Sequence, residues 1–484
     1  MRFLDPTTVF VSDRRLLGGP SIALEWGRLI SAIAVVIWLT TPAIGFLRAL
    51  ELMTVIGFVA AVFGFARPSL GLIGLSLVCT LDPLTRQFLA GGLVRWNTFN
   101  YLLLVVMLTS AMFVVRLGDP HSRLLKALLA LMLAELVISP SLTNGVQHLL
   151  GAVTMFGLLV YFAQARDDAD SLYSVGLVNG LVTAVGGLFF YINQSSLPEI
   201  NPNVFAFFPE TGLFCICFGF RAAARQKSGQ LILGVLAVMN FAWVFLSGSR
   251  GGLAIAAVCL LFVLFSVRGV KQRLGFVAAA GVMAFLASNV FADLQGYSLH
   301  RITKLLDDDQ SAAARTSGRS DLARAGIHMA TLHPFGVGTG GFAPTWASLG
   351  FLPGMSSFKR GEEFQAHSGW IKVLAENGWP GFLLMAAYVG SFAYYGMRSR
   401  VPGGRGLGLL TFAALTVAFL STEFQGKGFW LLAAGTTAAL HPAEMVRCLR
   451  IDARRFAVRP RRVGVTAAVI GKDDTPGQAE RLAL

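Results

Sequence analysis

A single arginine stands at the edge of an apolar stretch in this chain, where an unpaired charge is costly. Arg250 lies in the sequence SGSRGG (residues 247–252), which joins two apolar stretches within Phe245–Phe262. The second stretch is expected to begin as a helix beside Arg250, and a helix N-terminus favours anions. A guanidinium also binds phosphate through paired hydrogen bonds and keeps its charge next to lipid. Arg250 is therefore either a ligand for an anionic group or an anchor at the membrane interface.

A histidine stands before another apolar stretch. His367 falls in residues 363–377, which have helical spacing, and Glu363 lies one turn before it. The residues expected on the same helix face are Trp370, Ile371 and Leu374. Glu376 is expected to point the opposite way, so it is not the direct partner of His367. Because histidine titrates near neutral pH, His367 is a candidate general base, and a packed histidine is the alternative.

Arg319 is a second candidate cation. It lies near the start of an expected helix that Ser317 or Ser320 caps and that ends at His333-Pro334. The partly apolar face of this helix is expected to contain Leu322, Ile327, Ala330 and Leu332. Arg319 either stabilises negative charge or is an ordinary charged residue of a loop.

A run of glycines follows this helix, in the sequence GVGTGGF (residues 336–342). Glycines allow another backbone or a ligand to approach closely. The run is not a nucleotide-binding fingerprint, because no strand precedes it and no Lys-Ser/Thr pair follows it. It forms either a tight turn or a nest of backbone amides for a phosphate group.

The elements that must position these residues are membrane helices. Of the 484 residues, 55% are hydrophobic and 14% are charged, against about 25% charged in soluble domains. Apolar runs of about 18 residues, the length of a transmembrane helix, recur along most of the chain. Fourteen spans are expected, at about 29–47, 50–66, 69–82, 98–115, 122–139, 146–163, 175–192, 203–220, 230–247, 250–267, 272–291, 378–395, 406–422 and 427–440. The third span is short, and a re-entrant segment is its alternative.

Basic residues predict the orientation of these spans. With the N-terminus inside, the inner loops carry fourteen Lys and Arg residues and the outer short loops carry five, as the positive-inside rule requires. Both termini are then cytoplasmic, and the one long connection lies on the outer face. The expected parts are a cytoplasmic N-terminal segment (1–28), a bundle of about eleven spans (29–291), an outer loop with the candidate site (292–377), three C-terminal spans (378–440) and a basic cytoplasmic tail (441–484).

The net charge of +14 does not indicate a nucleic-acid partner. Most basic residues lie in short loops between apolar runs or in the tail, and the chain offers no aromatic stacking platform or basic groove. Four of the five cysteines fall inside expected spans and one lies in the tail, so no disulfide framework is implied.

Three pieces of the sequence, in order, resemble the O-antigen ligase and polymerase superfamily of bacterial envelope polysaccharide enzymes. They are SGSRGG at the opening of a span; Gly318-Arg319, His333-Pro334 and GVGTG (336–340) with Phe342; and Ala366-His367 with LAENG (374–378) and a returning span. The pieces cover about 140 residues, roughly Leu246 to Tyr388, and the other spans agree only in hydropathy. The family often has Asn after the histidine, whereas this chain has Ser368, which lacks the paired donor and acceptor of an amide.

This resemblance implies an all-α polytopic membrane protein with about 12–14 transmembrane helices and one large helical periplasmic loop, in the bacterial inner membrane. It implies a glycosyltransferase that moves a glycan from undecaprenyl diphosphate to an acceptor hydroxyl on the periplasmic face. The acceptor is lipid A-core for a ligase and another lipid-linked glycan for a polymerase. The resemblance implies no metal or nucleotide cofactor, and the acidic run at residues 307–309 is interpreted as a solvated charge cluster.

The chemistry of such a transfer assigns roles to the candidate residues. A diphosphate is already a good leaving group, so the protein must bind it, stabilise charge and remove a proton from the acceptor. Arg250 is assigned to the diphosphate, Arg319 to the diphosphate or the transition-state charge, and His367 to base catalysis or acceptor positioning. The further site residues are Gly338 and Gly340 for donor binding and Glu363, Glu376 and Ser368 in support. A single displacement would invert the anomeric centre.

The alternative function is transport of polysaccharide or lipid-linked sugar, since many flippases and antiporters also have about this number of spans. Such folds usually have internal repeats, which this chain does not show. Two carboxylates inside expected spans, Glu135 and Glu210, are functional candidates by default. Neither belongs to the three matched pieces, so a structural hydrogen bond is predicted for both.

Overall fold

A computed structural model describes residues 22–64, 68–89, 120–163, 169–193, 197, 202–222, 227–267, 269–290, 319–349, 364–399, 403–421 and 427–440. The regular secondary structure in these ranges is helical throughout, with no strand. The helices long and apolar enough to cross a membrane, by length and composition, include Phe46–Phe63, Ala169–Asn193, Asn203–Phe220 and Ser228–Ser247. The predicted fold class, an all-α polytopic membrane protein, is confirmed.

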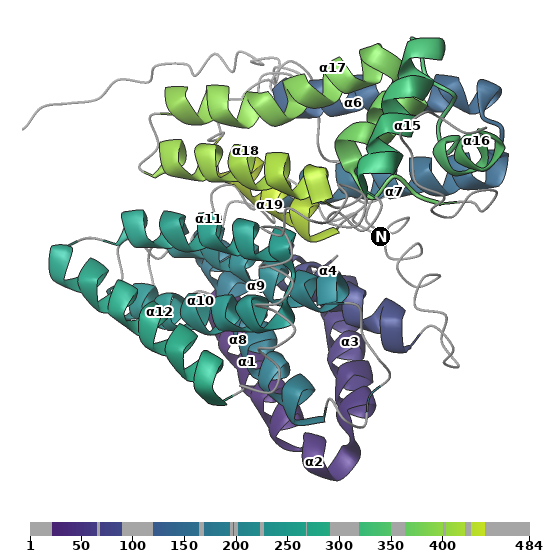
Figure 1. The fold of residues 1–484 in the computed structure, drawn as a ribbon. Coiled ribbons are helices and arrows are strands. Elements are labelled where there is room, and N and C mark those ends of the chain that lie inside the picture. Colours follow the sequence, from purple (N-terminus) through teal and green to yellow (C-terminus); the bar gives the residue numbers. More distant parts are fainter. Residues whose placement is uncertain are drawn as a thin grey trace, which may run out of the picture. The chain divides into compact units, whose positions relative to one another are not determined.

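The helices follow one another along the chain as Figure 1 labels them. The first are α1 (Ile22–Leu39), α2 (Thr41–Ile44), α3 (Phe46–Phe63), α4 (Pro68–Phe88), α6 (Pro120–Ala134), the 3-10 turn η2 (Glu135–Ile138) and α7 (Leu142–Ala163). The next are α8 (Ala169–Asn193), α9 (Pro202–Ala222), α10 (Lys227–Ser247), α11 (Arg250–Ser266) and α12 (Val270–Val290). The last are α15 (Arg319–Leu332), α16 (Phe342–Ser348), α17 (Gly369–Arg398), α18 (Gly404–Ser421) and α19 (Lys427–Leu440).

These helices agree with most of the expected spans. The bounds of the first span, 29–47, are wrong, because α1 ends at Leu39 and α2 lies inside the expected range. Every expected span overlaps a helix except the one at 98–115, which lies outside the described residues. The third span is longer than predicted, because α4 continues through Pro83 to Phe88. The division into cytoplasmic, membrane and periplasmic parts stays a prediction.

Small residues let neighbouring membrane helices approach closely. A Cβ built on Gly219 of α9 would lie 3.0 Å from the Cα of Gly176 in α8. One built on Gly408 of α18 would lie 2.5 Å from the Cα of Gly396 in α17. Lipid tails are as apolar as leucine, so close packing rather than the hydrophobic effect holds such pairs together. The pairs α8–α9 and α17–α18 therefore depend on glycine at these points.

α17 contains a break that divides it into two parts. Gly378 has φ 62° and ψ −164°, outside the helical region, and Pro380 follows it. The helical spacing expected over residues 363–377 thus ends where the structure breaks the helix, at Gly378. The predicted start at Glu363 is not confirmed, because α17 begins at Gly369. The first part belongs to the expected outer loop and the second to the expected span at 378–395.

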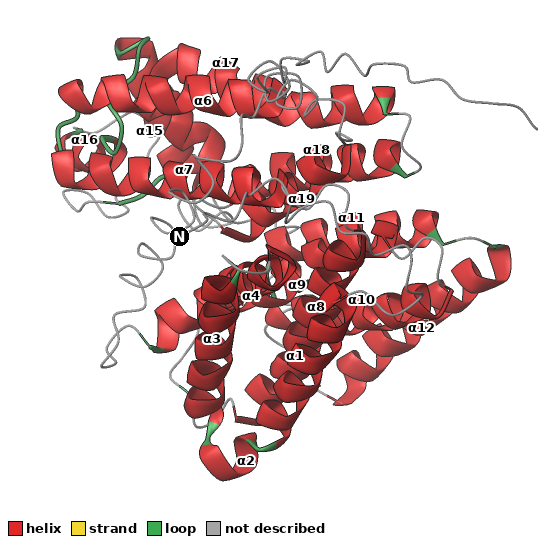
Figure 2. Cartoon of the chain, turned by 180° about the vertical axis from the view of Figure 1, so that it is seen from behind, coloured by secondary structure: helices red, strands yellow, loops and turns green. Residues whose placement is uncertain are grey.

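The described part of the expected outer loop has a small apolar core of its own. Its buried members are Leu322, Ala325, Met329, Phe342, Trp346, Ala366 and Ala375. They come from α15, α16 and the region where α17 begins, and Figure 2 shows these elements together from behind. The predicted face of α15 is partly wrong, because Ile327 is 49% exposed and Leu332 is 59% exposed. The glycine turn (residues 336–341) joins α15 to α16.

Candidate functional site

Arg250 is the first residue of α11, as predicted, and its side chain is partly exposed. Gly248, with φ 74°, turns the chain from α10 into α11. Ser249 caps the new helix, since its Oγ accepts the Gly252 N–H at 3.1 Å. The same Oγ donates to Asn203 Oδ1 of α9 at 2.8 Å. The contact with α9 therefore fixes the start of α11 and with it the backbone of Arg250.

His367 lies just outside α17, so its predicted position on the apolar face of a helix is wrong. It is the only non-glycine residue with positive φ, at 50°, in the described part of the chain. Ser368 is the cap of α17: its Oγ accepts the Ile371 N–H at 3.4 Å and donates to the Phe419 carbonyl of α18 at 2.9 Å. A capping residue has non-helical dihedrals, so the helix starts after it and excludes the histidine. The ring of Phe364 meets the His367 ring edge-on, with centroids 5.1 Å apart.

Arg319 is the first residue of α15, which runs beside the first part of α17 (Figure 1). A Cβ built on Gly326 of α15 would lie 2.3 Å from Ile371 Cγ2 of α17. Beyond the end of α15, the Pro334 carbonyl accepts the Trp379 N–H of α17 at 2.9 Å. The two helices therefore run in the same direction, and Arg319 lies at the end of the pair where α17 begins.

The packing of α11 on α18 places Arg250 toward the end of the site where α17 begins. α11 packs on α18, and a Cβ built on Gly406 near the start of α18 would lie 3.4 Å from the ring of Phe262 near the end of α11. The two helices run in opposite directions (Figure 1), so α11 begins toward the end of α18. That end is where the Phe419 carbonyl holds Ser368. The starts of α11, α15 and α17 therefore all lie toward one end of α18.

The glycine turn packs between α17 and the start of α7. Gly336, Gly338 and Gly340 have φ of 89°, 94° and 79°, values that favour glycine. A Cβ built on Gly336 would lie 2.1 Å from the carbonyl oxygen of Glu376. One built on Gly340 would lie 2.4 Å from the backbone nitrogen of Gly145 in α7. Glycine is thus required both for the backbone conformation and for the close approach.

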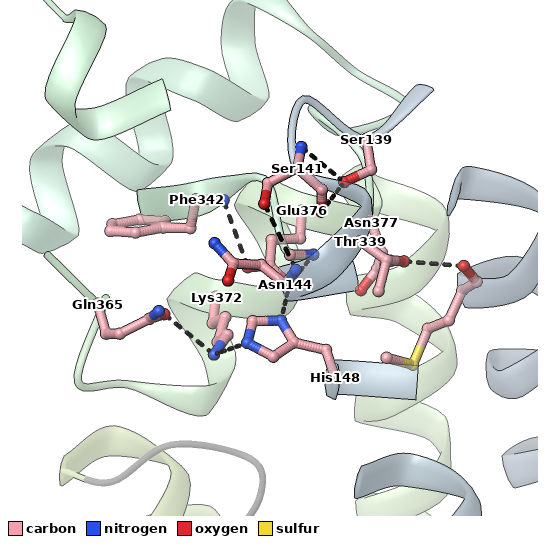
Figure 3. Close-up of polar contacts among 12 residues, drawn as sticks. Ser139, Ser141, Asn144, His148, Thr339, Phe342, Gln365, Lys372, Glu376 and Asn377 are labelled. Atoms are coloured by element: carbon pink, nitrogen blue, oxygen red, sulfur yellow. Dashed lines mark hydrogen bonds and ion pairs between the residues drawn. The ribbon is translucent and has the colours of Figure 1, made fainter. Parts of the chain in front are cut away.

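The anion that the glycine turn binds is the carboxylate of Glu376 (Figure 3). Its Oε2 accepts the Gly340 N–H at 3.0 Å, and its Oε1 accepts the Phe342 N–H at 3.3 Å. The Gly338 N–H donates to the Glu376 carbonyl at 3.0 Å. This favours the tight-turn interpretation over the phosphate nest, because the amides of Gly338 and Gly340 already donate to the protein itself.

A histidine and a lysine outside the predicted site complete the surroundings of Glu376. His148 of α7 has its Nδ1 3.3 Å from Glu376 Oε2 and its Nε2 3.1 Å from Lys372 Nζ. Lys372 also donates to Gln365 Oε1 at 3.2 Å, as Figure 3 shows. Burial raises the pKa of Glu376, but Lys372, His148 and the Gly340 N–H outweigh it and hold this pKa below its ordinary value.

Two signals in the sequence point toward these residues. Lys372 stands four positions before Glu376, the spacing that brings opposite charges together on a helix. His148 lies inside the expected span 146–163, and an ionisable residue in a span is a functional candidate by default. Neither signal shows that the three side chains meet, because His148 and Glu376 are 228 positions apart.

Glu135 takes part in a neighbouring buried contact. Asn377 Nδ2 donates to Glu135 Oε2 and to Thr339 Oγ1, the latter at 3.1 Å. Thr339 Oγ1 in turn donates to the Met132 carbonyl of α6 at 2.9 Å. The structural hydrogen bond predicted for Glu135 is confirmed, and it ties the end of α6 to the break in α17.

Glu210 has a different environment. It is buried in α9, and its Oε2 has no hydrogen-bond partner in the described part of the chain. A Cβ built on Gly252 of α11 would lie 2.3 Å from Glu210 Oε1. The carboxyl therefore lies against the first turn of α11, where the helix dipole favours negative charge. The Oε2 atom therefore does not make the predicted hydrogen bond within the described residues.

Some predicted features lie outside the described residues. They are Glu363, the alternative cap Ser317, the Gly318 that precedes Arg319, and the acidic run at 307–309. The supporting role of Glu363 stays a prediction.

Comparison with known proteins supports the interpretation of this region. Residues 235–386 match the family model described as O-antigen ligase. A search of curated proteins finds no match. The matched residues include the start of α11, the whole of α15, the glycine turn and Glu376. The family implies an enzyme of the ligase or polymerase type that acts in a membrane. The predicted resemblance to the O-antigen ligase and polymerase superfamily is thereby confirmed for residues 235–386 of this multi-pass membrane protein.

Proposed function

We propose that this protein is a metal-independent glycosyltransferase that moves a glycan from undecaprenyl diphosphate to an acceptor hydroxyl. The transfer takes place on the periplasmic face of the bacterial inner membrane, with both protein termini in the cytoplasm. The acceptor is lipid A-core in the ligase form of the reaction and a second lipid-linked glycan in the polymerase form. Besides the family match, one observation carries the proposal: Arg250, Arg319 and His367 stand at or just before the starts of three helices that begin toward one end of α18.

This arrangement suits a diphosphate ligand. The first N–H groups of a helix have no partner within the helix, and the helix dipole adds partial positive charge there. Arg250 and Arg319 place a permanent cation at the start of α11 and of α15. Because guanidinium is weakly hydrated and binds phosphate through two donors, it holds an anion beside lipid better than an ammonium does. We assign the diphosphate to these two arginines and not to the amides of the glycine turn.

The reaction needs one proton transfer and one displacement. The acceptor oxygen attacks the anomeric carbon while the bond from that carbon to the diphosphate oxygen breaks. The diphosphate keeps the electron pair, and Arg250 and Arg319 stabilise the charge that develops on it. His367 takes the proton from the acceptor hydroxyl, which leaves a neutral glycoside and an imidazolium. A single displacement of this kind inverts the anomeric centre.

The proposal is tested by replacing His367 and Arg250 singly with alanine in a strain that lacks the chromosomal gene. Each variant is expected to lower glycan transfer by a factor of about 100 or more, the usual effect of removing a general base or a charge-stabilising donor. Arg250→Lys is expected to restore little, because lysine lacks the planar fork. Transfer is measured from the envelope glycan profile, with the amount of membrane protein checked for each variant.

Two control variants accompany these replacements. His328→Ala removes a different histidine, which lies in α15. Arg398→Ala removes an arginine at the far end of α17, where it lies over the Tyr394 ring. Both are expected to keep transfer within about twofold of the wild type, since surface changes away from a site cost little. If His367→Ala and Arg250→Ala both transfer glycan at the wild-type rate, the site assignment is wrong.

The same strain separates ligase from polymerase. Loss of a ligase leaves long glycan chains on the lipid carrier, because the chains are made but not attached to lipid A-core. Loss of a polymerase leaves single repeat units, because elongation stops. If the deletion instead abolishes the arrival of carrier-linked glycan at the outer face, the protein is a transporter and the enzyme class is wrong.

A further inference from the structure

The short segment that carries His367 is held on both of its sides. On the N-terminal side, Gln365 Oε1 accepts a hydrogen bond from Lys372 Nζ at 3.2 Å. On the C-terminal side, Ser368 Oγ donates to the Phe419 carbonyl of α18 at 2.9 Å. Ala366, between these anchors, is buried in the small apolar core of α15, α16 and α17. His367 is therefore a partly exposed residue between two anchors.

The backbone of His367 explains why two anchors are needed. A non-glycine residue with φ near 50° is in the left-handed region, which is disfavoured by crowding of its Cβ. Such a conformation persists only where the surrounding structure determines it from several sides, and it is common at functional sites. Loss of one anchor would let the segment relax to a more usual backbone and turn the imidazole away.

Lys372 is suited to be a rigid anchor because it is itself fixed. The residue is 3% exposed, and a buried ammonium must be paired. A carboxylate only accepts hydrogen bonds, so the proton between His148 and Glu376 belongs to His148 Nδ1. In the neutral imidazole Nε2 is then an acceptor, and it takes a hydrogen bond from Lys372 Nζ at 3.1 Å. Lys372 and Glu376 thus lie on either side of the His148 ring.

We propose that Lys372 is a positioning residue for His367, which it holds in place through Gln365 and which it couples to the buried His148–Glu376 pair. This inference concerns the conformation of the His367 segment, and its catalytic meaning rests on the proposed function. The chain of contacts runs from the glycine turn through Glu376, His148 and Lys372 to the residue two positions before His367. The three pieces of sequence that resemble the family do not include Lys372, His148 or Gln365, although Gln365 and Lys372 lie within the matched residues 235–386.

The test uses the full-length protein in detergent and a probe that needs no substrate. Diethyl pyrocarbonate modifies neutral imidazole, and mass spectrometry of the peptide with His367 gives the rate of its modification. Gln365→Leu removes the acceptor for Lys372, whereas Gln365→Glu keeps an acceptor of the same length. We expect the rate in Gln365→Leu to change by about fivefold, as for the loss of one hydrogen bond. In Gln365→Glu we expect it to stay near that of the wild type.

A matched control shows whether any lost hydrogen bond of α17 has the same effect. Trp370→Phe removes the bond from Trp370 Nε1 to the Thr416 carbonyl of α18, 3.1 Å long, and leaves both anchors of His367 in place. We expect no change in the His367 modification rate. Lys372→Met should change that rate as Gln365→Leu does, and Gln365→Leu keeps the test valid if Lys372→Met does not fold. An unchanged rate in a folded Gln365→Leu protein overturns the proposal.

Glycan transfer in membranes of the complemented deletion strain gives a second, separate readout. Gln365→Leu is expected to lower transfer by about 10- to 100-fold, because a catalytic group displaced by about 1 Å loses that much. Gln365→Glu should restore transfer. If the modification rate changes but His367→Ala leaves transfer intact, Lys372 still positions His367, and the catalytic role proposed for His367 is wrong. If the modification rate of His367 does not change, the positioning role of Lys372 is wrong, whatever the glycan transfer of the variant.

Discussion

At the scale of single residues, Glu376 is the best-connected group of the site. Its two oxygens accept hydrogen bonds from Gly340, Phe342 and His148, and Lys372 lies on the far side of the histidine. A buried carboxylate with this many donors is stabilised in its charged form. Glu376 therefore acts first on structure, by holding the glycine turn against α17. Its effect on the reaction is indirect and passes through the elements that it fixes.

Replacing Glu376 with glutamine tests this role. Glutamine keeps the shape but removes the charge and turns one acceptor into a donor that faces a backbone N–H group. The variant is expected to lose about 3 kcal/mol of unfolding free energy at neutral pH, as for a broken buried pair. Unfolding in mixed detergent micelles measures this loss. A loss below about 0.5 kcal/mol, the range of ordinary surface changes, would contradict the role.

The pH dependence of stability follows from the lowered pKa of Glu376. Its ordinary value is 4.5, and the folded protein binds the proton less tightly than the unfolded chain. The contribution of Glu376 to stability is thus complete above about pH 4.5 and is lost as the pH falls through the folded pKa. The thermal unfolding midpoint of the wild type should fall over this acidic range more steeply than that of Glu376→Gln. Parallel curves for the two proteins would mean that another group causes the acid sensitivity.

At the scale of elements, the glycine turn and the break in α17 fit together as one unit. A Cβ built on Gly378 would lie 2.2 Å from the Pro334 carbonyl oxygen, so the two backbones touch at this point. The Val337 and Gly338 N–H groups donate to the carbonyls of Ala375 and Glu376, at 2.9 and 3.0 Å. α17 thus ends its first part where the glycine turn can satisfy its free carbonyls.

Gly340→Ala is expected to disturb this unit strongly. The new Cβ would meet the backbone of Gly145 at 2.4 Å, and φ 79° disfavours any side chain. The cost is expected to be at least about 2 kcal/mol of unfolding free energy, with a matching loss of glycan transfer. The control is Gly390→Ala in α17, where a Cβ would have no neighbour within 4 Å. That change should stabilise the helix by up to about 1 kcal/mol, and equal effects of the two variants would contradict the account.

At the scale of the whole described structure, the candidate residues lie at helix ends that are close to one another on the same side of the helix bundle. Contacts among Glu135, Asn377, His148 and Glu376 join the end of α6, α7, the first part of α17 and the glycine turn. Ser368 joins the start of α17 to the end of α18, toward which α11 begins. In the expected topology, all of these ends face outward. The topology is a prediction from the charges of the loops, whereas the contacts come from the structure, and the two agree on which ends lie together.

Cysteine labelling tests the orientation directly. Ser348→Cys places a thiol at the exposed end of α16, and Ser399→Cys places one after α17. The described native cysteines are buried, and Cys448 of the expected cytoplasmic tail is replaced with serine in both variants to keep the background low. A maleimide that cannot cross membranes should label Ser348→Cys in intact spheroplasts and Ser399→Cys only after permeabilisation. The reverse pattern would place the candidate site in the cytoplasm and exclude the periplasmic reaction.

The amino-acid sequence alone determined the fold class and the positions of most helices. Apolar runs of membrane length, the SGSRGG joint and the proline after Gly378 are local properties, and local properties are readable in order along a chain. The start of α11 at Arg250 and the end of α15 before His333 were predictable for this reason. The position of His367 was not, because helical spacing cannot show that Ser368 caps the helix by accepting the Ile371 N–H while its hydroxyl donates to the Phe419 carbonyl of α18.

The tertiary structure decided which of these residues meet. In the folded chain, an amide of the glycine turn donates to Glu376. His148 also contacts Glu376, although the two residues are 228 positions apart in the sequence. The tertiary structure also left the Oε2 atom of Glu210 without the predicted hydrogen bond within the described residues. Contacts of this kind depend on which helix faces pack together, and hydropathy in a span that is apolar all round does not specify a face. The chemistry of the candidate site could thus be predicted from residue types. Which residues contact one another was decided by the packing of α7, α17 and α18.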